Sequence, residues 1–202
     1  MNDSLIKTAL FTALWCLGHS VPITHTVRDR MRNLFPRYHI FDRAVFVIYS
    51  TMTLVILLAW LRTQPQNMLW DWPGWWSVVR WVGLLEAVVL FWLGSRSYSG
   101  SSFLGLNQIR DFAAGRPATD PELCTTGILG IIRHPWYTGT LIFLTFCLPV
   151  TDVNLTWRAV MVLYVLVGSE LEERKLLRDL GDSYAEYRRR VPRFFPSPFK
   201  RP

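Results

Sequence analysis

The stretch that decides the fold is residues 44–61, AVFVIYSTMTLVILLAWL, which contains no charged side chain. A helix of this length and composition reaches across the hydrocarbon core of a bilayer. Two further apolar runs lie on either side of it. Residues 76–94 include only two charged side chains, and residues 5–21 carry one lysine near their start. The amino-terminal half is therefore predicted to cross a membrane three times.

Two shorter apolar runs, 136–150 and 159–169, follow in the carboxy-terminal half. Only a few polar residues separate them, so we expect them to form a helical hairpin. The predicted fold class is an all-α polytopic membrane protein with about five transmembrane helices. Helices four and five form the hairpin, and a cytoplasmic helical tail follows them. The run at 5–21 lacks a small-x-small cleavage site, so we expect it to be retained.

The net charge of +7 is unevenly distributed along the chain. Five arginines lie in 22–43, four lie in 95–135, and nine lysines and arginines follow residue 170, whereas 62–75 has one and 151–156 has none. Short loops rich in lysine and arginine stay on the cytoplasmic side of a membrane. We therefore expect an integral membrane protein with its amino terminus outside and its carboxy terminus in the cytoplasm. Its partners should include membrane lipids and exclude nucleic acid.

Local signals predict where the helices begin and end. Pro135 suits the first turn of a helix because its missing N–H is not needed there, and Gly181 is a good helix stop. The polar stretch 96–127 should be mostly loop, with a turn or two of helix near 103–114. The predicted helices are 4–21, 24–34, 41–61, 75–95, one from Pro135 to before Pro149, 156–180 and 182–190.

The first motif with chemical potential is Arg133-His134-Pro135, at the boundary where a polar loop enters an apolar helix. A helix start exposes unpaired N–H groups and a partial positive charge. Arg133 adds a planar cation that suits a carboxylate. Gly139 lacks a side chain on the same face as Pro135, so either a ligand or another helix can approach. The competing structural interpretation is a snorkelling arginine, a boundary histidine and a small packing residue.

The second motif begins at Glu172-Glu173, where the last apolar helix leaves the membrane. Adjacent helical residues lie about 100° apart around the axis, so the two carboxylates should not share one role. One could point into a pocket and bind an ammonium group or ribose hydroxyls. Both could instead belong to a solvated, salt-bridged face. Tyr184 and Tyr187 share a face of the next helix. They either cover a flat base of a ligand or fix the tail helix to the membrane surface.

Taken together, these residues resemble a known group of membrane enzymes. The carboxy-terminal half, about 104–196, is similar to the isoprenylcysteine carboxyl methyltransferase and phospholipid methyltransferase superfamily. Leu180 stands where that superfamily often has an aromatic residue. In the amino-terminal half, the pattern consists of Trp15-x3-His19-Ser20, the basic segment to Arg43, and Trp60 followed by Leu69-Trp70-Asp71. This pattern resembles bacterial methanethiol S-methyltransferases and membrane proteins associated with nitrogen-oxide reduction gene clusters, which implies a bacterial inner (cell) membrane. The positions of the carboxy-terminal half that match the isoprenylcysteine carboxyl methyltransferase and phospholipid methyltransferase superfamily are Gly127, Arg133, His134, Pro135, Tyr137, Gly139, Glu172, Glu173, Leu176, Gly181, Tyr184, Tyr187, Val191, Pro192 and Arg193.

The resemblance implies S-adenosylmethionine as cofactor, bound by Gly127, His134, Pro135, Tyr137, Gly139, Glu172, Glu173, Tyr184 and Tyr187. It implies one domain, 1–202, with three transmembrane helices in 1–95 and a cofactor-binding core in 96–202. No Gly-x-Gly-x-x-Gly motif is present, so a Rossmann-type methyltransferase is not expected. The three cysteines lack metal-ligand spacing, so no metal site is expected.

The implied reaction is direct methyl transfer to a small or hydrophobic acceptor, first of all a thiol. A prenylated cysteine carboxylate or a lipid amine is the alternative. Arg133 and Arg193 are candidates for orienting the acceptor. His19, the one histidine expected within a span, is the third catalytic candidate, weighed evenly against a satisfied buried histidine. A non-catalytic scaffold or conduit for a redox (nitrogen-oxide) pathway is the hypothesis from a different class.

Overall fold

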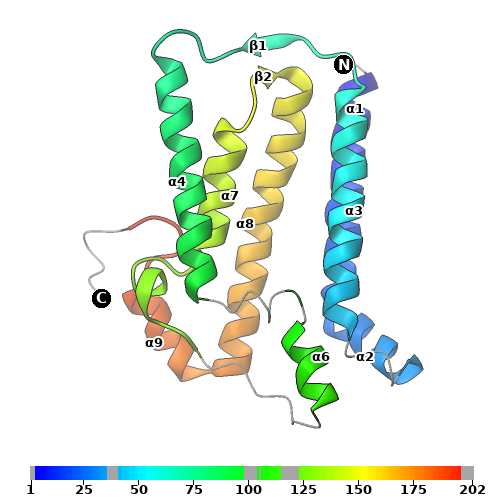
Figure 1. Ribbon diagram of the computed structural model, residues 1–202, viewed down its shortest axis with the longest axis vertical. Helices are drawn as coiled ribbons and strands as arrows, with labels where there is room; N and C mark the ends of the chain where they lie inside the picture. Colours follow the sequence, from blue (N-terminus) through cyan, green and yellow to red (C-terminus); the bar gives the residue numbers. More distant parts are fainter. Residues whose placement is uncertain (1–2, 36–40, 98–103, 105, 115–122, 197–202) are drawn as a thin grey trace. The chain divides into compact units, whose positions relative to one another are not determined.

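The protein is described here by a computed structural model that covers residues 3–35, 41–97, 104, 106–114 and 123–196 (Figure 1). Part of the predicted polar stretch 96–127 lies outside these residues. The chain divides into two compact units, each described by itself. The first combines residues 1–66 with 99–120, and the second combines 67–98 with 121–202. The helix predicted at 75–95 thus groups with the carboxy-terminal core.

In the first unit, two long helices lie side by side (Figure 1). Trp15 donates from its indole nitrogen to Thr53 Oγ1 at 3.1 Å, and the rings of Phe11 and Trp60 meet edge to face with centroids 4.7 Å apart. Polar and aromatic contacts of this kind join helices whose other faces are apolar. The helical elements are α1 (Asp3–Ser20), the 3-10 helix η1 (Val21–Ile23), α2 (His25–Leu34), α3 (Asp42–Arg62) and α6 (Leu106–Ala113).

Among the described helices, α3 and α4 (Trp76–Ser97) are long and apolar enough to cross a membrane. Their most apolar windows have mean hydropathies of 2.3 and 1.6, yet only 11% and 22% of these windows are buried within the protein. A core helix of a soluble protein would bury most of such a surface. The outward apolar surface indicates a membrane protein.

The second unit contains α4, α7 and α8 side by side, with α7 contacting both of the others (Figure 1). Besides α4, the described elements of this unit are β1 (Met68–Trp70), η3 (Gly127–Gly130), α7 (Pro135–Phe146), β2 (Val150–Thr151), α8 (Asp152–Leu180) and α9 (Asp182–Arg190). The strands β1 and β2 pair antiparallel, with Met68 opposite Thr151 and Trp70 opposite Val150. The described chain is mostly helical, as the sequence predicts.

Small residues let α4 and α7 approach closely. Gly83, Ala87 and Gly94 are buried along one face of α4. A Cβ added to Gly83 would overlap the Phe146 ring, and one added to Gly94 would overlap the indole of Trp136. Apolar helix surfaces and lipid tails have similar polarity, so the hydrophobic effect does not drive helices together within a membrane. Close packing at small residues is then a main source of helix association.

The short helix α7 ends among arginines supplied by its neighbours. Arg80 of α4 donates to the carbonyls of Phe146 (3.0 Å) and Cys147 (3.1 Å). Arg158 of α8, which is buried, donates to the carbonyls of Leu148 (2.8 Å) and Pro149 (3.2 Å). The last carbonyls of a helix lack partners within the helix. Arg80 satisfies the carbonyl of Phe146 at the end of α7, and Arg158 binds carbonyls of the turn that follows.

Helix α8 begins earlier than its predicted start at residue 156. Thr151 caps it, because its hydroxyl accepts a hydrogen bond from the Asn154 amide at 3.0 Å, and Asp152 adds a negative charge in the first turn. Both features stabilise a helix start. The helix ends as predicted at Gly181, whose φ of 57° favours glycine. The turn at Gly181 directs α9 back towards the start of α7.

Candidate active site

A buried carboxylate, Glu173, is the centre of the polar site. It lies in the last third of α8 and its side chain is 0% exposed. Oε1 accepts from Arg133 Nε at 2.9 Å, and His134 Nε2 lies 3.1 Å from the same oxygen. Oε2 accepts from Arg193 at 2.9 Å and lies 3.2 Å from Arg188 Nε. We call these five residues the Glu173 cluster.

The pKa of Glu173 reflects this arrangement. Burial by itself raises the pKa of this carboxyl group, but hydrogen bonds from Arg193 and Arg133 outweigh burial and lower the pKa to about 2. Glu173 is therefore ionised at neutral pH. Its oxygens already have at least four donors, which is about the capacity of a carboxylate. Its main role in the structure is to hold the cluster together.

Arg133 is almost fully used by the protein. Its Nε and Nη2 donate to Glu173 Oε1, and its Nη1 donates to the carbonyls of Arg188 (2.9 Å) and Val191. These four hydrogen bonds leave one of the five guanidinium N–H groups. Arg133 therefore joins α7, α8 and the end of α9, and retains little capacity for a bidentate contact with a methyl acceptor.

His134, next to Arg133, is placed between the two adjacent glutamates. Burial lowers its pKa below the usual 6.5, and the charges of Glu172 and Glu173 offset this only in part, so the ring is neutral at pH 7. Because Glu173 is an ionised acceptor, we assign the ring proton to Nε2. Nδ1 is then an acceptor, and it lies 3.8 Å from Glu172 Oε2. Two acceptors thus face each other at this position.

Glu172 and Glu173 differ sharply in burial. The side chain of Glu172 is 45% exposed, against 0% for Glu173. The sequence predicts different roles for these neighbours, and the structure places them in different environments. Glu172 is the one whose carboxylate remains accessible.

The segment after α9, residues 191–194, lies against the start of α7, and we call it the strap. The amides of Arg133 and His134 donate to the carbonyls of Pro192 (2.9 Å) and Arg193 (3.1 Å). The Thr138 hydroxyl donates to the carbonyl of Phe194 at 2.9 Å, or to that of His134 at 3.0 Å. The strap therefore satisfies the amides of the two residues that precede α7.

Tyr184 and Tyr187 are the two buried residues of α9, with exposed fractions of 1% and 4%. Their rings meet edge to face at 5.8 Å, and the Tyr187 hydroxyl donates to the Leu129 carbonyl at 2.7 Å. Burial and the charge of Glu173 raise the pKa of Tyr184 to about 12. Together with Val191 they form a small core. In this structure both tyrosines attach α9 to the rest of the unit.

The other predicted cofactor residues occupy the loop and the first turns of α7. Pro135 is the first residue of α7, and the ring of Tyr137 lies 5.2 Å from that of His134. Gly139 faces α4, because an added Cβ would meet the Phe91 ring at 3.2 Å. Gly127 opens η3 with a φ of 62°. Of the alternatives for Gly139, close approach of a helix is the one observed.

The predicted catalytic residues lie in both units. Arg133 and Arg193 come together at Glu173 in the second unit. His19 lies in the first unit, where its ring is 5.1 Å from Trp15 and 5.0 Å from Phe46. Its role in catalysis stays a prediction.

Three polar residues of this site were not singled out by the sequence. Glu170 accepts from Arg193 at 2.6 Å, Arg188 lies beside Glu173, and Thr138 contacts the strap. The spacing of Glu170 and Glu173, one helical turn apart, was a usable signal, because residues three apart share a helix face. Arg188 lies in a run of three arginines that carries no positional signal.

Comparison with known proteins places this chain in a family. Residues 8–150 match the family described as NnrU protein. Methanethiol S-methyltransferase 1 of Bradyrhizobium diazoefficiens is 27% identical, covering 96% of this chain and 67% of its own length. Methanethiol S-methyltransferase of Mycobacterium tuberculosis is 29% identical, covering 99% and 81%. Human Protein-S-isoprenylcysteine O-methyltransferase is 27% identical, covering 71% and 50%. No solved structure gives a significant match.

These matches agree with the resemblance seen in the motifs. The family match covers more than half of the chain, and the bacterial relatives extend over nearly all of it. The chain belongs to the NnrU protein family, within the isoprenylcysteine carboxyl methyltransferase-like superfamily.

Proposed function

We propose that this protein is an integral-membrane methyltransferase that uses S-adenosylmethionine and methylates a small or hydrophobic thiol. The observation that carries the proposal is its similarity, over nearly the whole chain, to proteins named methanethiol S-methyltransferase. The half-exposed carboxylate of Glu172 beside His134 Nδ1 supports it, because these two acceptors suit a polar cofactor.

The membrane arrangement is part of the proposal. Helices α3 and α4 are proposed to span the membrane together with α1. Helix α7 has 12 residues, about 18 Å, so it is too short to cross alone. We propose that α7, continued by the apolar residues up to Val150, and the first part of α8 form the two arms of the predicted hairpin, which makes about five spans in a bacterial inner membrane. The basic tail is then cytoplasmic.

The residues present fit the proposed cofactor. S-adenosylmethionine carries an ammonium, a carboxylate, ribose hydroxyls and an adenine, and it supplies an electrophilic methyl group on a sulfonium. Glu172 and His134 Nδ1 are two acceptors that suit an ammonium or hydroxyl donor. We propose that Glu172 binds the cofactor and that Glu173 positions His134 and the arginines. Tyr137, beside His134, is the aromatic group best placed to contact the flat adenine or the cationic sulfonium of the cofactor.

Of the three guanidinium nitrogens of Arg193, only Nη2 makes hydrogen bonds within the described residues. The other two nitrogens can therefore each donate a single hydrogen bond to an acceptor. We propose that Arg193 orients an anionic acceptor and that Arg133 acts through Glu173. A thiol acceptor must also lose a proton before methyl transfer. Direct displacement depends mainly on alignment and on exclusion of water.

The first test is the thermal stability of detergent-solubilised protein with and without S-adenosylhomocysteine. At about 100 times its dissociation constant, a ligand stabilises the folded state by roughly 2.7 kcal/mol. We expect a clear rise in the melting temperature of the wild type. Glu172→Gln, which changes a half-exposed side chain, should fold normally and lose most of this rise. His134→Ala should lose it too.

A second assay tests the acceptor. Methylation is measured with a panel of small thiols, a prenylated cysteine and a lipid amine. Turnover of thiols supports the proposal, whereas preference for the prenylcysteine or lipid would assign the alternative chemistry suggested by the human relative. A well-folded protein that neither binds S-adenosylhomocysteine nor methylates any member of the panel would overturn the enzyme proposal in favour of a membrane scaffold.

A further inference from the structure

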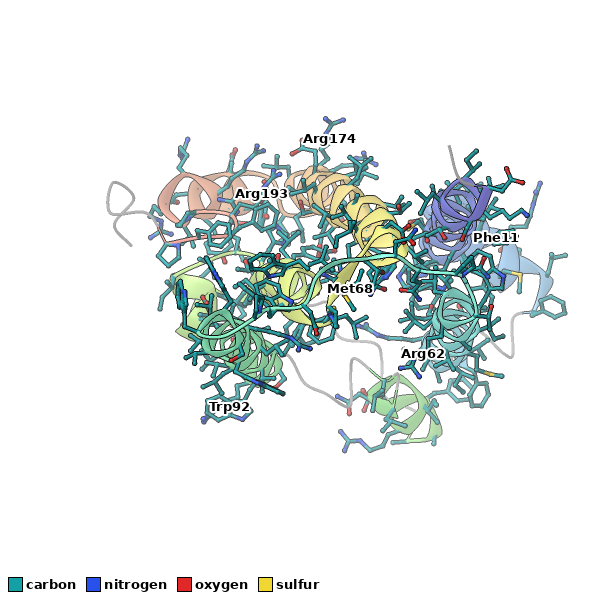
Figure 2. All side chains as sticks on the ribbon, turned by 90° about the horizontal axis from the view of Figure 1, so that it is seen from above. Phe11, Arg62, Met68, Trp92, Arg174 and Arg193 are labelled. Atoms are coloured by element: carbon teal, nitrogen blue, oxygen red, sulfur yellow. The ribbon has the colours of Figure 1, made fainter. Side chains whose placement is uncertain are left out.

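Arg193 is held by two carboxylates of α8 that are one helical turn apart. Its Nη2 donates to Glu170 Oε2 at 2.6 Å and to Glu173 Oε2 at 2.9 Å (Figure 2 labels Arg193). Hydrogen bonds between ionised groups are stronger than neutral ones. The side chain of Arg193 is 26% exposed and that of Glu170 is 38% exposed, so this pair forms the outer edge of the Glu173 cluster.

The backbone around Arg193 makes contacts with α7. The carbonyls of Pro192 and Arg193 accept the amides of Arg133 and His134, the two residues that begin the site. The side chain of Arg193 thus attaches the strap to α8, while its backbone attaches the strap to α7. Weaker hydrogen bonds to the Arg193 side chain should therefore also weaken the hydrogen bond that the His134 amide donates to the Arg193 carbonyl.

Glu170 can be separated experimentally from Glu173. Glu173 is buried among several cations, so its removal perturbs the whole cluster. Glu170 contacts Arg193 and, through Oε1, Arg174 Nε at 3.0 Å. The side chain of Arg174 is 66% exposed, so its pair with Glu170 is an ordinary surface pair of little energetic weight. The contribution of Glu170 to the site therefore runs through Arg193.

We propose that Glu170 is a positioning residue for the cofactor site, which it serves by holding Arg193 and thereby the strap against the start of α7. The inference rests on the proposed function for its effect on cofactor affinity. Its structural part, the restraint of the strap, can be measured without any ligand.

The central variant is Glu170→Gln, which keeps the size of the side chain and removes its charge. Loss of one charge-assisted, partly exposed hydrogen bond should weaken binding of S-adenosylhomocysteine by roughly three- to tenfold. If the enzyme turns over, the KM for the cofactor should rise by a similar factor, and the KM for the acceptor should rise with it, because Glu170 acts through Arg193, which is proposed to orient the acceptor.

Two matched controls carry comparable surface changes. Arg174→Gln removes the other partner of Glu170, and Glu186→Gln breaks the exposed pair with Arg190, whose charged atoms are 3.8 Å apart. Both should bind S-adenosylhomocysteine like the wild type. In an Arg193→Gln background, adding Glu170→Gln should have no further effect, since residues that act through one another are not additive.

The ligand-free readout is hydrogen exchange of the backbone amides of Arg133 and His134. Glu170→Gln should speed this exchange several-fold, and neither control should do so. Unchanged exchange, or equal acceleration in Arg174→Gln, would overturn the inference. A wild type that fails to bind S-adenosylhomocysteine would overturn the proposed function, and the exchange experiment would still decide whether Glu170 restrains the strap.

Discussion

Replacing Glu173 by glutamine should destabilise the protein strongly, although the two side chains have nearly the same shape. Glu173 is the buried anion that faces Arg133, Arg188 and Arg193. Glutamine can accept hydrogen bonds from some of these groups, but it leaves the buried guanidinium of Arg133 without a counter-charge. Breaking a buried ion pair by removing one partner typically costs about 3–5 kcal/mol.

The pKa of Glu173 leads to a similar magnitude. The cluster lowers it from 4.5 to about 2, and a shift of that size corresponds to about 3 kcal/mol of preference for the ionised form. For a protein of 150–250 residues, 1 kcal/mol changes the melting temperature by roughly 2–4 °C. The expected loss is therefore about 6–12 °C at pH 7.

The pH dependence has a definite sign. The pKa is lower in the folded than in the unfolded state, so the stabilisation is fully present above about pH 4.5 and is lost as the pH falls towards 2. The melting temperatures of wild type and Glu173→Gln, measured in detergent, should differ most at pH 7 and converge below pH 4.5. Glu186→Gln, on an exposed pair, is the control. A difference at pH 7 of less than about 2 °C would refute the reasoning.

Three further predictions concern packing and capping, and each is checked by the melting temperature in detergent. Tyr187→Phe leaves the buried carbonyl of Leu129 unpaired and should lower stability by about 1–2 kcal/mol. Arg158→Met removes one donor from the carbonyls of Leu148 and Pro149, which keep Trp72 and Asn154 as donors, and should lower stability by about 1 kcal/mol. Gly94→Ala forces a methyl group into the indole on α7 and should cost about 1–3 kcal/mol, whereas Gly168→Ala, with open space around it, should be neutral or stabilising.

Much of the helical framework is predictable because it depends on local signals. The uncharged run at 44–61 corresponds to α3, Pro135 begins α7 and Gly181 ends α8. The apolar run predicts a start of α8 near residue 156, which is too late, because the capping residue Thr151 lies before the apolar run begins. The β1–β2 ladder escaped prediction, since strands of three and two residues, far apart in the chain, have no periodicity to detect.

The candidate site was only partly predictable. The sequence indicates that charged and aromatic groups gather at the ends of two helices. It does not reveal that Arg133 is used by the protein itself, because its partners lie 40 or more residues away. Nor does it reveal the strap, whose hydrogen bonds to the start of α7 join segments that are distant in the chain.

The sequence by itself determined the helices, the outward apolar surface and the family, because apolar runs, helix stops and motif spacing are properties of neighbouring residues. Only the tertiary structure decided that Glu173 is the buried centre and Glu172 the accessible acid. Adjacent residues differ by about 100° around a helix. Which of them faces the protein is set by the rotation of α8 against α7 and the strap, and that rotation arises from packing between segments far apart in the chain.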